Sequence, residues 1–145
     1  MSVGRICSRI VATASPRESV RVAARRMAGH RVGTLVVVSA EGVGEAVGIL
    51  TDRDVVVRCI AGDLDPDTTP IEKVMSESVH TVSEGTPIEE AIAEMARGAT
   101  RRLVVTDHDG RPVGVLSLDD VLDLLIEEAG SIGRLLERQR PYINA

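Results

Sequence analysis

The sequence predicts an α/β (α+β) fold built from two tandem repeats, each ordered α-(β)-α-β-β-α, that pack about a pseudo-two-fold axis. The first observation is that the chain of 145 residues matches itself at an offset of 68 residues and then of 66. The second is that a helical apolar stripe precedes two short β-branched runs in each half. One such unit has too few strands to fold alone, so we expect two copies to face one another and bury both sheets.

The predicted repeats span 2–62 and 70–130, and the polar, turn-rich stretch 63–69 links them. Residues 131–145 predict a helical tail outside the repeat, which either packs on a partner subunit or frays. Positions that match between the halves include Thr13 and Thr81, Met27 and Met95, Leu35 and Leu103, Gly48 and Gly114, and Asp54 and Asp120.

Three proline-containing capping boxes predict where helices begin. They are Ser15-Pro16-Arg17-Glu18, Thr69-Pro70-Ile71-Glu72 and Thr86-Pro87-Ile88-Glu89. After the first and the third box, apolar residues recur at i, i+3, i+4 and i+7, which is one face of a helix. These stripes are Val20, Ala23, Ala24 and Met27 in the first repeat and Ile88, Ala91, Ile92 and Met95 in the second.

Short β-branched runs predict strands at 35–38 and 47–50, and again at 103–105 and 113–116. Turn residues separate the strands of each pair and predict hairpins, with Glu41, Gly42 and Gly44 in the first repeat and Asp109 and Gly110 in the second. A helix follows each hairpin, and in the second repeat its stripe is Leu118, Val121, Leu122 and Leu125.

Composition disfavours several classes of function. Aromatic residues are 1% of the chain, with one Tyr and no Trp or Phe, and the net charge is −5. Nucleic-acid binding is therefore disfavoured, because both the basic field and the stacking platforms are missing. No signal peptide and no apolar run of about 18 residues is present, so we expect a cytoplasmic protein without a membrane partner.

The chain also lacks the patterns of common metal and catalytic sites. Cys7 and Cys59 are far apart, and neither they nor His30, His80 and His108 have zinc-finger spacing. We therefore expect no metal site, although a site using Cys59 and a histidine stays open as an alternative. No Walker loop, Ser/His/Asp order or paired-carboxylate cleft is present, so we expect no enzyme activity.

One heptapeptide occurs twice, as GILTDRD at 48–54 and as GVLSLDD at 114–120. In a structural interpretation, Thr51 and Ser117 cap helices, and the acidic residue three places on favours the positive helix end. In a functional interpretation, the same hydroxyl and carboxylate bind a phosphate or ribose at that helix start. The two interpretations are compatible.

The repeat resembles the CBS domain, named after cystathionine β-synthase, and the pair resembles a Bateman module. The resemblance rests on both heptapeptides and on the passages HRVGTLVV at 30–37 and TRRLVV at 100–105, and it covers about 90% of the chain. It implies a non-catalytic regulatory module that binds AMP, ADP, ATP or S-adenosylmethionine between the repeats, requires no cofactor and regulates an unknown protein. It also implies a disc-like homodimer. The alternative is a structural or interaction dimer without a nucleotide.

The resemblance also implies site residues. Asp54 and Asp120 would bind ribose, with Thr51 and Ser117 beside them, and Arg101 and Arg102 would meet phosphate. The walls that face these groups would be Ala12, Val32 and Gly33 in the cleft at Ser117, and Val79, Thr100 and Arg101 in the cleft at Thr51. Because Gly33-Thr34 replaces Arg101-Arg102, we expect unequal clefts. The cleft at Ser117 would suit a phosphate-bearing ligand better, and Arg53 would partly compensate in the other.

Overall fold

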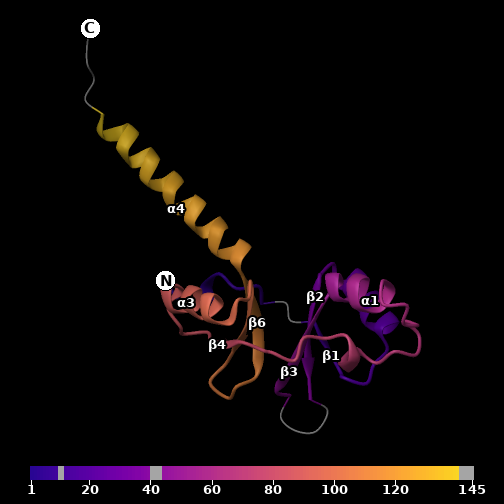
Figure 1. Ribbon diagram of the computed structural model, residues 1–145. Helices are drawn as coiled ribbons and strands as arrows, with labels where there is room; N and C mark the ends of the chain where they lie inside the picture. The colour runs from indigo at the N-terminus through magenta and orange to yellow at the C-terminus, as the bar shows by residue number, and fades with distance from the viewer. Residues whose placement is uncertain (10–11, 40–43, 141–145) are drawn as a thin grey trace.

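The computed structural model describes residues 1–9, 12–39 and 44–140. Two similar bodies lie side by side, and one long helix projects from the second (Figure 1). The first repeat contains η1 (Val3–Arg5), β1 (Thr13–Ala14), α1 (Val20–His30), β2 (Thr34–Val38), β3 (Ala46–Thr51), α2 (Asp52–Asp54) and η2 (Val55–Ile60). The second contains η3 (Ile71–Lys73), β4 (Thr81–Ser83), α3 (Ile88–Gly98), β5 (Arg102–Thr106), β6 (Pro112–Ser117) and α4 (Leu118–Gln139).

Each repeat forms one three-stranded sheet, in the order β1-β2-β3 and β4-β5-β6. The first pair in each sheet is parallel and the second is an antiparallel hairpin, in which Leu35 lies opposite Leu50 and Leu103 opposite Leu116. The predicted fold class and both hairpins are thus confirmed. Gly110 adopts φ +78, which suits its turn, whereas the predicted turn residues Glu41 and Gly42 lie outside the described residues.

The short opening helix of each repeat packs in the core of the other repeat. Val3 and Cys7 lie in the cluster that contains Leu103 and Leu116. Likewise, Ile71 and Val74 lie in the cluster of the first repeat. The sequence repeats are therefore interleaved in space, and each core is closed by residues from both halves.

The segment that follows each opening helix crosses a strand of the other repeat. Ser8 pairs with Val115 through N–H···O bonds of 3.0 Å in both directions, and Ser76 pairs with Ile49 in the same way at 2.9 Å. This crossing explains the glycine of GVLSLDD, because a Cβ at Gly114 would lie 2.7 Å from the Ser8 carbonyl oxygen. A side chain at that position would push the crossing segment away.

A third apolar cluster lies between the two sheets and buries one face of each. Its buried members are Val36, Ile49 and Val104, and Val79 and Val115 pack against them. The predicted burial of sheet against sheet is thus observed, and aliphatic side chains alone build the cluster.

The prediction that the three proline-containing boxes cap helices is wrong. Helix α1 begins at Val20, and the Ser19 hydroxyl caps it by accepting from Val22 N at 3.3 Å. Pro70 and Pro87 are the N-cap residues of η3 and α3, with extended ψ angles of 149 and 147. Tertiary pairing explains these angles, because Pro70 and Pro87 form antiparallel bridges with Ser19 and Ser2, respectively.

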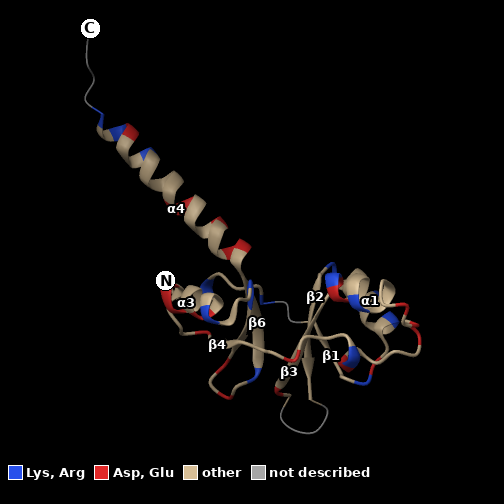
Figure 2. Ribbon diagram, in the orientation of Figure 1, with Lys and Arg blue, Asp and Glu red and all other residues tan. Residues whose placement is uncertain are grey.

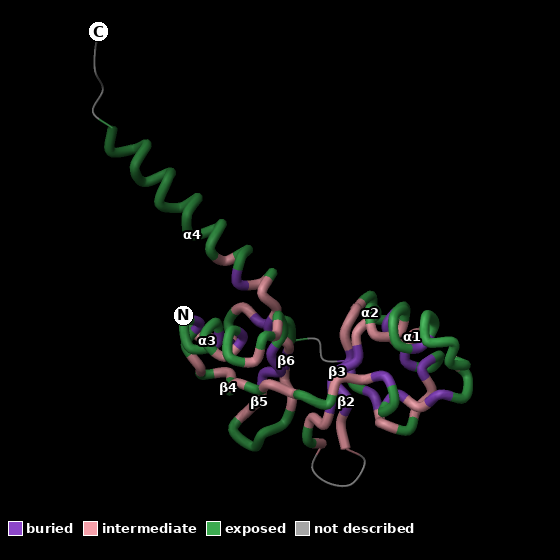
Figure 3. The backbone as a smooth tube through the Cα atoms, viewed as in Figure 1, coloured by how far each residue is buried: buried purple, intermediate pink, exposed green. Residues whose placement is uncertain are grey.

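Helix α4 continues through the predicted end of the second repeat as one element of 22 residues, about 33 Å long. Its first turns touch the body, where Val121 is buried (Figure 3). From residue 125 to residue 139 every position is exposed.

Candidate functional site

Two cavities lie between the repeats. The first, of about 240 Å³, is here termed the Thr51 cleft. The second, of about 250 Å³, is termed the Ser117 cleft. The described residues lining the Thr51 cleft are Ile49, Thr51, Ser76, Ser78, His80, Gly98, Thr100, Arg101 and Arg102. Those lining the Ser117 cleft are Ser8, Val32, Gly33, Thr34, Arg102, Val115, Ser117, Asp119 and Asp120.

The two clefts are related by the internal repeat. Residues at matching positions line both of them, and the matching pairs are Ile49 with Val115, Thr51 with Ser117, Ser76 with Ser8, Thr100 with Val32, Arg101 with Gly33, and Arg102 with Thr34. The pseudo-symmetry therefore extends from the fold to the cavities, and the clefts differ by these substitutions.

Both heptapeptides form complete capping boxes. Thr51 Oγ1 accepts from Asp54 N at 3.2 Å, and Asp54 Oδ2 accepts from Thr51 N at 3.0 Å. The corresponding distances for Ser117 and Asp120 are 3.1 and 2.8 Å. The structural interpretation is confirmed, and because Thr51 and Ser117 also line the clefts, the capping hydroxyls are positioned to meet a ligand.

The two carboxylates of the boxes are not equivalent. Asp120 lines the Ser117 cleft, whereas Asp54 is absent from the described lining of the Thr51 cleft. Asp54 Oδ1 instead lies 3.7 Å from the guanidinium nitrogen Nε of Arg58, one helical turn further on. The Asp120 carboxylate therefore lines a cleft where a ligand can reach it, whereas the Asp54 carboxylate does not.

The two clefts differ in the charged residues that line them. Arg101 and Arg102 both line the Thr51 cleft, together with His80, and no carboxylate is among its described lining residues. In the Ser117 cleft, Arg102 faces two carboxylates, Asp119 and Asp120. Arg101 lies on the Thr51 side of the boundary between the clefts, whereas Arg102 lies at that boundary and lines both, so the preference of the Ser117 cleft for a phosphate-bearing ligand stays a prediction.

Arg101 is also in contact with the edge of the Ser117 cleft, since its Nη2 lies 3.5 Å from Asp119 Oδ1. Both side chains are more than two thirds exposed, at 71% and 78%, so this ion pair is weak and can exchange for a ligand.

Besides Asp54, three predicted site residues are absent from the described lining of either cleft. Val79 packs in the cluster between the sheets. Its neighbours in the chain, Ser78 and His80, line the Thr51 cleft. Arg53 is exposed on the first turn of α2. Ala12 is 8% exposed and packs in the core of the first repeat.

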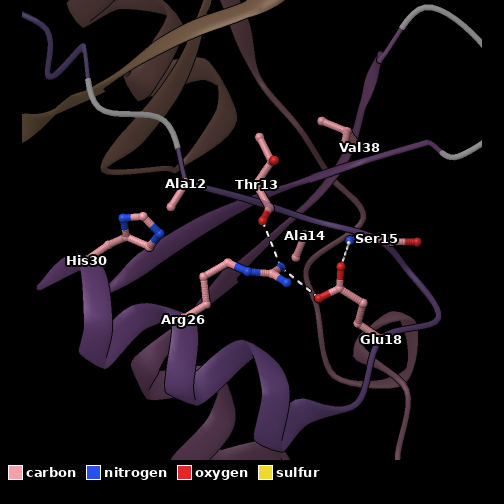
Figure 4. Close-up of a pocket in the computed structure, with 8 residues that line it drawn as sticks. All are labelled: Ala12, Thr13, Ala14, Ser15, Glu18, Arg26, His30 and Val38. Atoms are coloured by element: carbon pink, nitrogen blue, oxygen red, sulfur yellow. Dashed lines mark hydrogen bonds and ion pairs between the residues drawn. The ribbon is translucent and has the colours of Figure 1, made fainter.

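Ala12 instead lines a larger cavity of about 470 Å³ within the first repeat (Figure 4). Arg26 crosses this cavity, donates to the Thr13 carbonyl oxygen at 2.9 Å and lies 2.6 Å from Glu18 Oε2. Glu18 in turn accepts from Ser15 N through Oε1 at 3.2 Å. The charged groups here already neutralise one another, so this cavity offers a ligand less than the clefts do.

Sequence reasoning missed the residues that the crossing segments bring into the clefts, namely Ser8, Ser76, Ser78 and His80. The matching of Ser8 with Ser76 at the repeat offset was a signal, but only the pairing across repeats places them. The His80 ring lies 3.3 Å from Glu94 Oε1. Hydrogen bonds from Arg97 and, with a smaller effect, from His80 lower the pKa of the Glu94 carboxyl.

The described residues include both cysteines and other side chains that could bind a metal. Cys7 and Cys59 are buried, and burial raises the pKa of both thiols. Within the described residues, no group of three or more His, Cys, Asp or Glu side chains could hold a metal ion. Among the described helices, none combines the length and the apolar character that crossing a membrane requires.

The family model for the CBS domain matches the chain twice, at residues 3–60 and 71–127. The chain belongs to the CBS domain family. This CBS domain pair is 37% identical to the CBS domain-containing protein YhcV of Bacillus subtilis over 123 residues, or 83% of this chain and 84% of that protein. It is 33% identical over 124 residues to protein MK0525 of Methanopyrus kandleri, covering 86% of this chain but 62% of that longer protein.

A solved CBS structure is similar throughout. The CBS domain protein PAE2072 from Pyrobaculum aerophilum, complexed with AMP, is 28% identical and superposes with a TM-score of 0.76. The match covers 90% of this chain and 99% of that one. The arrangement of both CBS repeats is therefore shared.

Proposed function

We propose that this CBS domain pair is a cytoplasmic, non-catalytic regulatory module that binds an adenosine-containing ligand in the clefts between its repeats. The observation that carries the proposal is the pair of clefts lined at matching positions, each of which has a capping hydroxyl and Arg102 in its lining. The AMP complex of the similar Pyrobaculum protein supports it. The candidate ligands are AMP, ADP, ATP and S-adenosylmethionine, and the regulated partner is a separate protein.

In the Ser117 cleft, Asp120 is the proposed ribose acceptor. Its Oδ2 accepts from Ser117 N at 2.8 Å, but a carboxylate has about four lone-pair sites and can accept from ribose hydroxyls as well. Val32 and Val115 offer the base an aliphatic wall. This cleft therefore suits the nucleoside part of the ligand.

In the Thr51 cleft, the proposed ligand group is phosphate. Arg101 and Arg102 supply two guanidinium groups, which bind phosphate oxygens in a bidentate manner. Hydroxyl groups of Thr51, Ser76, Ser78 and Thr100 surround them. Asp54 acts here as a positioning residue, because it holds the Thr51 backbone through the capping box.

Regulation requires that the ligand favour one arrangement of the module over another. The interleaved cores provide a physical link, since a ligand between the repeats touches both Ser8 of one crossing segment and Ser117 of the strand end beside it. A ligand that tightens this contact changes the surface that a partner protein meets.

The test is calorimetric titration of the purified chain with each of the four ligands. Saturable binding with a stoichiometry of one or two, weakened by Arg102→Ala, supports the proposal. Absence of binding to all four contradicts it and favours the structural or interaction protein instead. Turnover of a bound nucleotide, followed by chromatography, would contradict the non-catalytic part.

A further inference from the structure

The Thr51 cleft contains a histidine, His80, in addition to its arginines and hydroxyl groups. His80 immediately precedes β4 and lines the cleft together with Arg101 and Arg102. Its side chain is 27% exposed, so the ring is mostly enclosed but open on one side. Imidazole changes its charge between pH 5 and 8. Among the described lining residues, His80 is therefore the only one of a type that titrates near neutral pH.

The ring lies against Gly98, the last residue of α3. A Cβ at Gly98 would lie 2.5 Å from the ring atom Cε1 and 2.7 Å from each ring nitrogen, so only glycine leaves room for the imidazole here. The matching positions in the first repeat have the opposite sizes, since His30 matches Gly98 and Ala12 matches His80. No histidine is among the described residues that line the Ser117 cleft. The imidazole is thus specific to the Thr51 cleft.

Helix α3 carries both acidic and basic residues (Figure 2), and two of them orient the ring. His80 Nδ1 lies 3.3 Å from Glu94 Oε1, and Arg97 Nε donates to Glu94 Oε2 at 3.1 Å. Hydrogen bonds from Arg97 and then from His80 lower the pKa of Glu94, so its carboxylate is ionised near neutral pH. An ionised carboxylate can only accept a hydrogen bond. Nδ1 therefore carries a proton whether the ring is neutral or charged.

The other ring nitrogen, Nε2, lies toward the cleft. It is 3.5 Å from Ser78 Oγ, and Ser78 lines the same cleft. Because Nδ1 holds the single proton of a neutral ring, Nε2 then presents a lone pair, which repels a phosphate oxygen. When the ring is protonated, Nε2 becomes a charged donor to that oxygen. The charge state of His80 thus decides whether this wall of the cleft repels or binds phosphate.

The charged groups around the ring act in opposite directions. Arg101 and Arg102, at the start of β5, line the cleft and oppose protonation of the ring, whereas Glu94 favours it. Arg97 opposes it too, but its charge is paired with Glu94. The described lining residues from the first repeat, Ile49 and Thr51, are uncharged. A bound phosphate adds about two negative charges beside the ring and so favours the protonated form.

We propose that His80 makes phosphate binding in the Thr51 cleft proton-linked, so that a phosphate-bearing ligand binds the protonated ring and Nε2 takes up a proton from solvent. This inference rests on the proposed phosphate site and deepens it. Two guanidinium groups keep their charge at any physiological pH, so they alone would give the cleft no such dependence. Glu94 acts as the positioning residue, because it determines which ring nitrogen meets the ligand.

The test is calorimetric titration of the full chain with AMP at about pH 8 and about pH 6.5, where the charge of imidazole changes. Each titration is run in two buffers of different ionisation enthalpy, which gives the number of protons taken up on binding. We expect the affinity for AMP to rise about tenfold at the lower pH, with uptake of up to about one proton. Adenosine, which lacks the phosphate, should show neither effect.

His80→Gln should abolish both the rise in affinity and the proton uptake. The titration of the AMP phosphate itself is common to the two chains, so it cancels in the comparison. His108→Gln is the matched control, because the His108 side chain is 89% exposed on the β5–β6 turn. This control should bind AMP with the same pH dependence as the unaltered chain.

A second pair of variants tests the role of Glu94. Glu94→Gln should move the rise in affinity to lower pH and reduce proton uptake, because it removes the negative charge beside Nδ1. Glu89→Gln makes the same change at an exposed position in the first turn of α3 and should alter neither quantity. Circular dichroism of each variant checks that it has folded.

The outcomes separate this inference from the proposed function. If AMP binds the unaltered chain and His80→Gln with equal pH dependence and equal proton uptake, the inference is overturned and the proposed function stands. A loss of affinity in His80→Gln without a change in proton uptake would also overturn it, because the ring would then act in one charge state only. Absence of AMP binding at both pH values would overturn the proposed phosphate site and this inference together.

Discussion

Arg102 lies directly opposite Ser117 in the antiparallel register of β5 and β6. The matching pair in the first repeat is Thr34 and Thr51, so one repeat has a guanidinium where the other has a hydroxyl. Arg102 lines both the Thr51 cleft and the Ser117 cleft. One cation therefore serves two cavities, and it cannot bind an anion fully in both at once.

Arginine substitutions should separate the two clefts. Arg102→Ala should weaken AMP or ATP binding by about 1.5–3 kcal/mol in either cleft, because it removes a charged hydrogen-bond donor. Arg101→Ala should weaken phosphate binding chiefly in the Thr51 cleft, which Arg101 lines, and at the Ser117 cleft it removes only the exposed ion pair with Asp119. Adenosine should be less sensitive than ATP to both changes. Titration calorimetry measures this, with Arg21→Ala in the opening turns of α1 as the control. Equal losses for adenosine and ATP would contradict a phosphate contact.

The capping carboxylates offer a matched pair for the ribose contact. Asp120→Ala and Asp54→Ala each remove one capping-box acceptor, so each should lower the free energy of unfolding by about 0.5–2 kcal/mol. Asp120→Ala should also weaken adenosine binding by at least about 1 kcal/mol, since only Asp120 lines a cleft. Urea unfolding and calorimetry together separate these effects. Comparable losses of affinity in both variants would show that the caps act through structure alone.

Gly114 should be intolerant of a side chain. A Cβ there would lie 2.7 Å from the Ser8 carbonyl oxygen and 2.8 Å from Cys7 Sγ, and the backbone oxygen cannot move without breaking its pairing with Val115. We expect Gly114→Ala to destabilise the fold by about 1–3 kcal/mol. Gly29→Ala in α1, where a Cβ meets nothing within 4 Å, should instead stabilise it by about 0.5–1 kcal/mol. Chemical denaturation compares the two, and a neutral Gly114→Ala would contradict the tight crossing.

Acid sensitivity should arise in part at the β5–β6 turn. The backbone N–H groups of Arg111 and Asp109 donate to Asp107 Oδ1 at 3.0 and 2.9 Å and lower the pKa of its carboxyl. A folded pKa below the unfolded value stabilises the fold above the unfolded pKa, and this contribution is lost as pH falls through the folded pKa. Asp107→Asn should therefore flatten the stability profile between neutral and acidic pH. Thermal unfolding across that range measures it, and an unchanged slope would contradict the assignment.

The elements defined by local chemistry could be predicted from the sequence. The strand pairing of Leu35 with Leu50 follows from two β-branched runs and a turn, and the caps at Thr51 and Ser117 follow from a hydroxyl three residues before a carboxylate. The helix starts predicted from the proline boxes were wrong because Pro70 and Pro87 pair with residues far away in the chain. Pairing of that kind leaves no local signal.

The cleft linings show the same division. Thr51, Ser117 and Asp120 belong to a repeated heptapeptide and could be assigned in advance. Ser8 and Ser76 reach the clefts only because the opening segments cross between repeats. That Arg102 lines both clefts depends on how the repeats are oriented, and the spacing of the sequence does not specify it.

The exchange of opening helices also has a consequence for the history and engineering of this chain. A single copy of the unit would present Val3 and Cys7 with no cavity of its own to fill, while its own sheet would lack the residues equivalent to Ile71 and Val74. Two separate copies could satisfy both needs by swapping these helices reciprocally. Gene duplication and fusion of such a domain-swapped ancestor would give the present arrangement, and a chain cut at the linker should reassemble from its two fragments rather than fold as independent halves.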